Sequence, residues 1–182
     1  MKKYLTIINC LAAFVFLFQS CKKEESLQFN YSGEKIILTL KPDSKTPTSF
    51  DSLGTVYFNA DSLATANKFP REALKDITIT DMEFTLLSAP VSENFNLIKT
   101  MEGSIWTADQ PSPVNIFNTD KISSRTIDKI VVSGINQNVK EKVFNNKYFT
   151  FSLKGELNDT LTKTQNIEVR FTYAVSLLGV KI

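Results

Sequence analysis

The stretch YFTFSLKGELNDTLTKTQNIEVRFTYAVSLL, residues 148–178, decides the fold class of this chain. Apolar and polar residues alternate along 149–157 and again, without a break, along 167–177. Such alternation predicts strands that bury one face and expose the other. Asn158-Asp159-Thr160 lies between the two segments and favours a turn. The stretch therefore predicts a long hairpin whose second strand is central or well covered.

Weaker alternation elsewhere predicts further strands, and a slipped phase near Asp81 predicts a β-bulge in the longest of them. The expected strands are 35–40, 53–58, 77–87, 102–107, 114–117 and 126–133, and the expected short helices are 61–67 with Asp61 as its N-cap, 71–74, 95–99 and 138–145. The fold class is therefore mainly β, an antiparallel β-sandwich of roughly eight strands with short helical inserts, with a half-open β-barrel as the alternative.

The amino-terminal segment has the pattern of an export signal. Met1-Lys2-Lys3 is positively charged, residues 4–18 are mostly apolar, and the small residue Ser20 precedes Cys21. These features predict a secretory signal over residues 1–20. A membrane-spanning helix needs about 20 apolar residues, whereas this run is shorter and is interrupted by Asn9.

The junction Phe18-Gln19-Ser20-Cys21-Lys22-Lys23-Glu24-Glu25 resembles the relaxed lipobox of Bacteroidota lipoproteins, although the usual box has leucine where this chain has Phe18. The resemblance implies cleavage between Ser20 and Cys21 and a diacylglycerol on the Cys21 sulfur. Two or more acyl chains hold a protein stably on a bilayer. Lys23-Glu24-Glu25 further resembles a surface-export signal, which implies the outer membrane with the domain surface-exposed rather than facing the periplasm.

Three parts of the chain follow from these patterns. Residues 1–20 are the lipoprotein signal peptide, residues 21–33 are the lipidated cysteine with a polar tether, and residues 34–182 form a single β-sandwich domain. The mature domain resembles secreted β-sandwich lipoproteins of the same bacteria.

Composition excludes several classes of function. The chain has 21 Lys and Arg against 19 Asp and Glu, and Lys2 and Lys3 leave with the signal, so the mature chain has 19 of each and no net charge. Without a basic patch, nucleic acid is not an expected partner. The chain has no histidine, which excludes Ser-His-Asp and Cys-His catalysis and ordinary zinc sites. With Cys10 in the signal and Cys21 as the anchor, no internal disulfide is expected. Neither a metal site nor a cofactor is expected.

Three tripeptides resemble the O-glycosylation acceptor pattern of Bacteroidota: Asp51-Ser52-Leu53, Asp61-Ser62-Leu63 and Asp159-Thr160-Leu161. The resemblance implies modification at Ser52, Ser62 and Thr160, which we expect at the edges of elements, within reach of an enzyme. Alternatively, these Asp-Ser and Asp-Thr pairs only begin turns and helices.

Two groups of residues are candidates for ligand chemistry. Trp106, followed by Asp109 and Gln110 in a proline-containing loop, is a candidate for stacking on a sugar ring, or alternatively packs into the core of its strand beside Ile105. Asp81 and Glu83, with Asp76 nearby, offer the carboxylates that a glycosidase would need. Acids on a solvated strand face are common, so we do not expect an enzyme.

The sequence therefore predicts a lipoprotein anchored in the outer membrane that acts as a non-catalytic binding or assembly module for an unknown protein or glycan partner. A lipid or glycan carrier is the alternative, and a carboxylate-dependent hydrolase is the third hypothesis.

Overall fold

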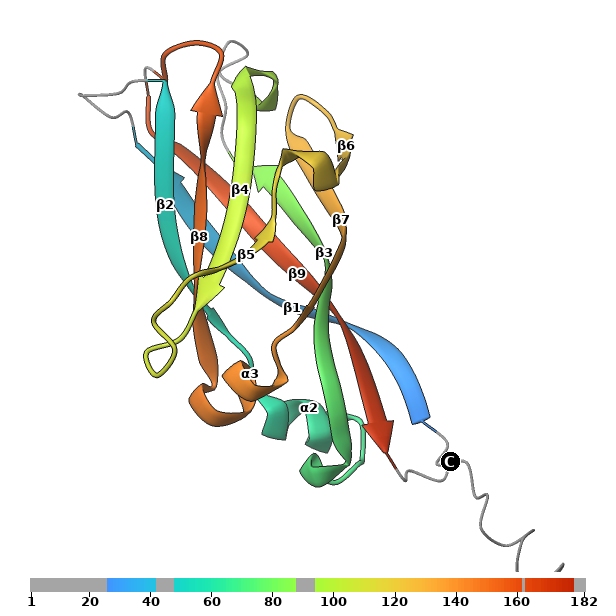
Figure 1. Ribbon diagram of the computed structural model, residues 1–182. Coiled ribbons are helices and arrows are strands. Elements are labelled where there is room, and N and C mark those ends of the chain that lie inside the picture. The colour runs from blue at the N-terminus through green and yellow to red at the C-terminus, as the bar shows by residue number, and fades with distance from the viewer. Residues whose placement is uncertain (1–25, 42–47, 88–93, 162, 179–182) are drawn as a thin grey trace, which may run out of the picture.

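The chain folds into two stacked antiparallel β-sheets (Figure 1). The computed structural model describes residues 26–41, 48–87, 94–161 and 163–178. One sheet has the order β1 (Ser26–Leu40), β9 (Gln165–Leu178), β3 (Leu74–Leu86), β7 (Lys129–Asn138) and β6 (Ile122–Arg125). The other has the order β2 (Ser49–Tyr57), β8 (Tyr148–Leu157), β4 (Ile98–Trp106) and β5 (Val114–Phe117). The predicted antiparallel sandwich is confirmed.

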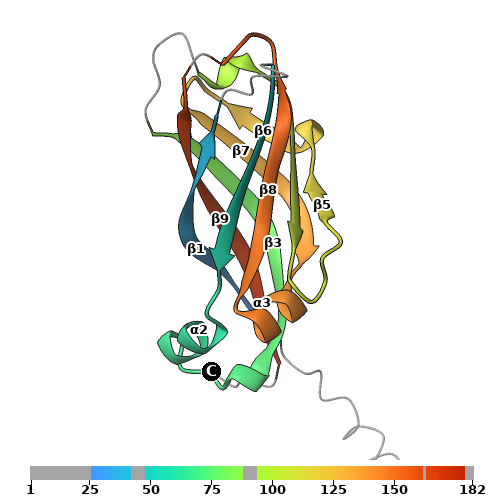
Figure 2. The same cartoon turned by 90° about the vertical axis from the view of Figure 1, so that its left-hand side faces the viewer.

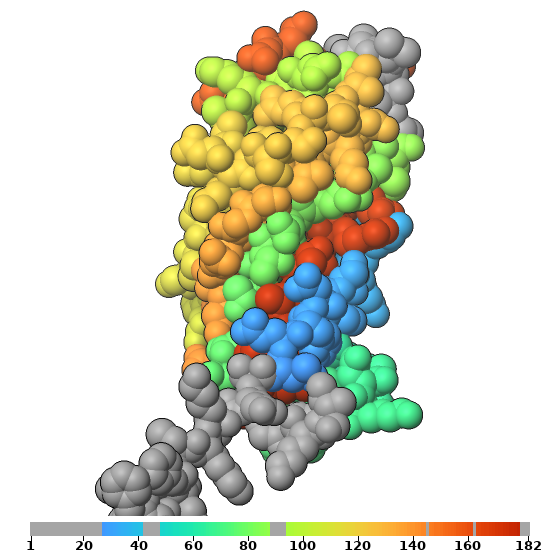
Figure 3. All heavy atoms as spheres, turned by 90° about the vertical axis from the view of Figure 1, so that its right-hand side faces the viewer, coloured from blue at the N-terminus to red at the C-terminus, as the bar shows by residue number. Residues whose placement is uncertain are grey.

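The connections between strands define the topology. The chain crosses between sheets after β1, β2 and β3, stays in one sheet from β4 to β5, and crosses again after β5, β7 and β8. If β6, an edge strand beside β7, is set aside, the order is that of an eight-stranded jelly roll. Figure 3 shows the side of the molecule on which β1, β3, β6 and β7 lie at the surface.

The predicted hairpin of residues 148–178 is wrong. The strands β8 and β9 exist as expected, but β8 pairs with β2 and β4, whereas β9 pairs with β1 and β3 in the other sheet. Alternation shows that each strand has one buried face and does not show whether two such faces lie side by side or opposite each other. The expectation that the last strand is central is confirmed, since β9 lies between β1 and β3.

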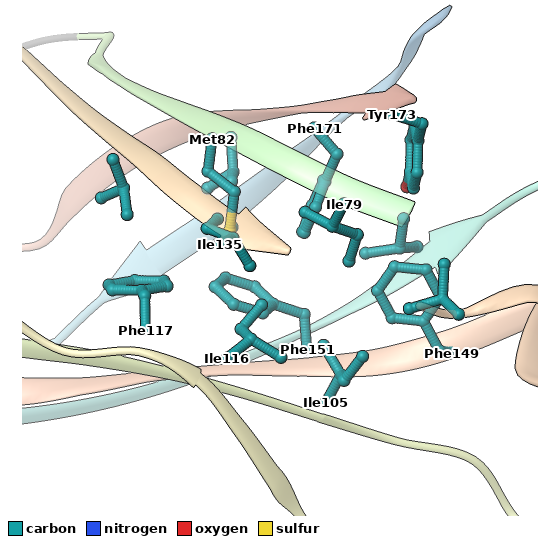
Figure 4. Close-up of a cluster of buried hydrophobic side chains, with 14 of the residues drawn as sticks. Ile79, Met82, Ile105, Ile116, Phe117, Ile135, Phe149, Phe151, Phe171 and Tyr173 are labelled. Atoms are coloured by element: carbon teal, nitrogen blue, oxygen red, sulfur yellow. The ribbon is translucent and has the colours of Figure 1, made fainter. Parts of the chain in front are cut away.

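The buried faces of β8 and β9 meet in an aromatic core (Figure 4). The Phe171 ring packs edge-on against Phe149 and Phe151, with centroid distances of 5.7 and 5.3 Å. Tyr173 lies next to Phe171 on β9 and packs edge-on against Phe58 at 5.1 Å. Edge-to-face contacts at these distances stabilise aromatic pairs beyond the area that they bury.

Short helices connect the strands. They are α2 (Ala60–Ala66), η1 (Arg71–Ala73), η2 (Phe95–Leu97), η3 (Thr119–Lys121) and α3 (Lys140–Asn146). The N-cap of α2 is Asn59, whose side chain accepts a hydrogen bond from the Ser62 backbone N–H, so the prediction of Asp61 as N-cap is wrong by two residues. Figures 1 and 2 place α2, α3 and the end of β9 at the same end of the sandwich.

The first strand begins earlier than the sequence predicts. The expected tether extended to residue 33, but β1 begins at Ser26 and pairs with β9 from there. Residues 26–33 are polar at alternate positions because one face of β1 is exposed, while Leu27, Phe29 and Tyr31 pack against the core. Cys21, Ser20 and the expected signal lie outside the described residues. The predicted bulge in β3 is confirmed by a register shift between Ile79 and Asp81.

Replacing Lys147 by glycine is expected to stabilise the fold by about 0.5–1 kcal/mol. Lys147 ends α3 in the left-handed conformation, with φ of 60°. Glycine adopts this conformation without the steric cost that a Cβ brings, although its unfolded state has more conformational entropy. Urea unfolding measures the change. The variant Lys147→Ala keeps the Cβ and should show no gain; an equal gain in both variants would assign the effect to the lysine side chain.

Candidate binding face

The outer side of the four-stranded sheet carries a band of uncharged side chains, which we call the neutral face. Directly paired residues share one side of an antiparallel sheet. Tyr148 pairs with Tyr57, and Thr150 pairs with both Thr55 and Trp106, so all of these point away from the core. The neutral face consists of Leu53, Thr55, Tyr57, Ser104, Trp106, Tyr148, Thr150 and Ser152.

Three aromatic rings lie at the end of the neutral face that is near α3. Tyr57 is 61% exposed and Tyr148 is 38% exposed, and their ring centroids are 6.1 Å apart. Trp106 is half-buried and diagonal to Tyr148, an arrangement in which Cβ atoms are separated by about 7 Å. In Figure 1, β2, β8 and β4 form the layer nearest the viewer, and no described helix crosses them. The exposure of Tyr57 and Tyr148 makes both rings accessible to a ligand.

Charged residues begin where the neutral face ends. Asp51 and Lys154 form an ion pair at 3.2 Å one position further along β2 and β8. Glu102 of β4 pairs with Lys154 in the same row, and Glu102 and Glu156 line a hollow of about 480 Å³ beside η3. Within the neutral face the polar groups are hydroxyls and the Trp106 indole N–H, so its chemistry suits a ligand without charge.

The other two predicted ligand contacts do not join Trp106 on this face. Asp109 Oδ1 accepts a hydrogen bond from Asn146 Nδ2 at 3.0 Å, and Gln110 Oε1 accepts one from Lys142 Nζ at 2.8 Å. The nearby Thr107 side chain and the Asn146 amide lower the pKa of Asp109 below its ordinary value. Asp109 and Gln110 therefore tie the 107–113 segment to α3, and of the three predicted residues only Trp106 belongs to the neutral face.

The predicted glycosylation residues differ in accessibility. Ser52 lies within β2, is 6% exposed and donates its hydroxyl hydrogen bond to the Thr39 carbonyl at 3.1 Å. The expectation that Ser52 is accessible at an element edge is therefore wrong, because β2 begins four residues earlier than predicted and turns this side chain inward. Ser62 in the first turn of α2 and Thr160 between β8 and β9 are exposed.

Two of the three carboxylates considered for hydrolysis, Glu83 and Asp76, have structural partners. Glu83 forms an ion pair with Lys129 at 2.8 Å. Asp76 accepts hydrogen bonds from Asn138 Nδ2 at 2.8 Å and from the Ser176 hydroxyl at 3.2 Å. The described residues contain no group of three or more Cys, Asp or Glu side chains that could hold a metal ion.

Between the sheets, the largest core side chains among the described residues are fully buried. One apolar hollow, lined by residues that include Leu40, Phe95 and Ile167, has a volume of about 20 Å³. This is room for about one water molecule and not for an acyl chain. Among the described helices, none has the length and apolar composition that crossing a membrane requires.

Sequence reasoning identified Trp106 but missed Tyr57 and Tyr148. Each tyrosine occupies an outward position at the end of a strand, where alternation predicts solvent exposure. An aromatic residue at a position where alternation predicts exposure is unusual, and this signal could have identified Tyr57 and Tyr148. Their proximity depends on the pairing of β2 with β8, which no local pattern predicts.

Comparisons with known proteins support no family assignment. No family model and no curated protein matches the chain. A "putative secreted protein" from Eubacterium rectale is 10% identical, with a TM-score of 0.36. The match covers 84% of this chain but only 40% of the Eubacterium rectale chain. The BFDV capsid protein is 8% identical with a TM-score of 0.39, over 84% of this chain and 99% of that one. The fold class therefore rests on the topology of this chain, a jelly-roll β-sandwich.

Proposed function

We propose that this chain is an outer-membrane lipoprotein whose β-sandwich is a non-catalytic binding module, and that its neutral face binds a neutral glycan. The observation that carries the proposal is the grouping of three aromatic rings and several hydroxyls, without a charge, on an uncovered sheet face. Lipid anchorage at Cys21 rests on the lipobox resemblance, and display of the module at the cell surface rests on the export-signal resemblance of Lys23-Glu24-Glu25.

The chemistry of the neutral face suits sugars in two respects. The C–H faces of a pyranose ring are apolar and pack on aromatic rings, which Tyr57, Tyr148 and Trp106 supply. The hydroxyls of a sugar exchange hydrogen bonds with Thr55, Thr150 and the tyrosine hydroxyls. An anionic polymer would gain no ion pair on this band and would meet Glu102 and Glu156 beyond it.

A protein partner is the competing occupant of the same face. Tyrosine and tryptophan are enriched at the centres of protein interfaces, so an assembly role would use the same side chains. A lipid carrier is less well supported, because the apolar hollow described above is too small for an acyl chain.

Alanine at Tyr57 or Trp106 is expected to weaken glycan binding at least tenfold, or about 1.4 kcal/mol, because each residue offers a ring face. Affinity electrophoresis of the mature protein through mannan, xylan and β-glucan gels identifies the polymer, and calorimetry measures the dissociation constant. The control is Ile127→Ala, which removes a side chain that is 51% exposed and lies between β6 and β7. Absence of binding to any neutral polymer would contradict the glycan proposal, and a protein partner lost in Tyr57→Ala would establish the assembly role instead.

The variant Cys21→Ala is expected to move the protein from the membrane fraction to the soluble fraction and to abolish incorporation of labelled palmitate. The acylated sulfur would supply most of the membrane affinity, at about 0.8 kcal/mol per buried CH₂. The variant Cys10→Ala is the matched control and should incorporate label normally. Unchanged membrane association in Cys21→Ala would contradict the anchor, and full protection of the domain from protease on intact cells would contradict surface exposure.

A further inference from the structure

The three aromatic rings of the neutral face form a row that crosses the strands. Tyr57 belongs to β2, Tyr148 to β8 and Trp106 to β4, and these strands are neighbours in that order. Adjacent strands are about 4.8 Å apart, so the row spans about 10 Å from β2 to β4. Along each strand, the outward residue next to the ring has a small hydroxyl side chain, namely Thr55 on β2, Thr150 on β8 and Ser104 on β4. The aromatic surface therefore extends across the sheet rather than along it.

The spacing within this row matches the repeat of a sugar chain. The ring centroids of Tyr57 and Tyr148 are 6.1 Å apart, which is similar to the length of one sugar unit in an extended chain. Trp106 lies one strand further on, diagonal to Tyr148. A chain that crosses the strands therefore places consecutive sugars over consecutive rings. A chain that runs along β2 would meet the Tyr57 ring and then only Thr55 and Leu53.

The two exposed rings of the row are not coplanar. The planes of Tyr57 and Tyr148 are inclined to each other by 53°. A crystalline polysaccharide presents parallel sugar faces in one plane, and two rings at this angle do not both lie flat on such a plane. A single chain whose successive sugars are rotated relative to each other stacks on both rings. The tilt therefore favours a soluble chain over a crystalline surface.

We propose that the neutral face binds an internal stretch of a soluble, linear, neutral polysaccharide, which crosses β2, β8 and β4 with three consecutive sugars over the three rings. Recognition of a chain end would need a pocket that encloses the last sugar. The hollows beside η3, between the sheets and beside α3 are not lined by Tyr57, Tyr148 or Trp106. This inference rests on the proposed glycan-binding function and specifies the class of glycan and its direction on the sheet.

Calorimetry of the mature chain with xylo-, manno- and cello-oligosaccharides tests the row. In the series that binds, the trisaccharide is expected to bind at least tenfold more tightly than the disaccharide, because it reaches a third ring. Alanine at either end of the row, Tyr57 or Trp106, should remove this gain and change disaccharide binding little. Alanine at Tyr148, the middle ring, should weaken the disaccharide as well. If the variant of half-buried Trp106 does not fold, Tyr57→Ala gives the same test at an exposed position.

The matched control is Leu53→Ala, because Leu53 is 61% exposed and lies on the neutral face beyond Thr55 along β2. This variant should bind like the wild type, and a loss equal to that of Trp106→Ala would show that the chain runs along the strands. Borohydride reduction of the terminal sugar should leave hexasaccharide binding unchanged. Dependence on that sugar, or binding to crystalline cellulose without binding to a soluble polymer, would overturn this inference and leave the glycan proposal standing. Absence of binding to every glycan tested would overturn the proposed function itself.

Discussion

Replacing Phe171 by alanine is expected to lower the free energy of unfolding by about 3–5 kcal/mol, the range for removing a fully buried phenylalanine. Phe171 is 0% exposed and contacts rings from both sheets. Its loss removes the edge-to-face contacts with Phe149 and Phe151 and leaves a cavity where the two layers meet. Because the surrounding strands belong to different sheets, they cannot close the cavity by a shift of one strand. Chemical denaturation with urea, followed by tryptophan fluorescence, measures the loss.

Two variants show whether the loss comes from this position. Phe171→Leu keeps most of the volume and should lose less than half as much. Tyr57→Ala removes an aromatic side chain of similar size from an exposed position and should change stability by about 0.5 kcal/mol or less. A small loss in Phe171→Ala would mean that the layers are less tightly packed than the ring contacts indicate. The near-neutral Tyr57→Ala result would also show that the binding variants of the neutral face are folded.

Local patterns predicted most strands of this chain because burial of one face is a local property. The alternation along 167–177 and the phase slip at Asp81 both appear in β9 and β3. The pairing of strands is a long-range property, and the assignment of β8 and β9 to one hairpin failed for that reason. In a jelly roll, consecutive strands lie mostly in opposite sheets, so the assumption that neighbours in sequence are neighbours in a sheet is wrong at most connections.

The same limit applies to the candidate sites. Trp106 is recognisable in the sequence as a lone tryptophan, but its aromatic neighbours come from β2 and β8 through cross-strand pairing. Ser52 matched a short motif, yet its burial depends on the inward side of β2 and on the carbonyl of Thr39 in β1. Lys142 carried no sequence signal, since a lysine in a short polar helix predicts a solvated side chain. Lys142 is buried because the 107–113 segment packs against it, and these two parts of the chain become neighbours only in the folded protein.

The variant Tyr173→Phe is expected to stabilise the protein by about 1–3 kcal/mol. The Tyr173 hydroxyl is buried in the core and has no hydrogen-bond partner among the described residues. Burial of an unsatisfied hydroxyl costs about this amount, and phenylalanine keeps the ring contacts with Phe58 and Tyr31. The Tyr173 ring packs closely against the backbone of Gly33 in β1. A Cβ at position 33 would lie only 2.7 Å from Tyr173 Cε2. Tyr148→Phe, at an exposed position, is the control and should change stability little.

The pH dependence of the same variant gives an independent test. Burial raises the pKa of the Tyr173 hydroxyl above its ordinary value of about 10, so the unfolded state ionises first as the pH rises. The wild type therefore loses stability above about pH 10, whereas Tyr173→Phe lacks this loss. The advantage of the variant should widen by about 1.4 kcal/mol per pH unit in that range. Urea unfolding at pH 7, 10 and 11 measures it. A constant difference between the two proteins, or a loss of stability in Tyr173→Phe at pH 7, would mean that the hydroxyl is solvated or hydrogen-bonded in the folded state.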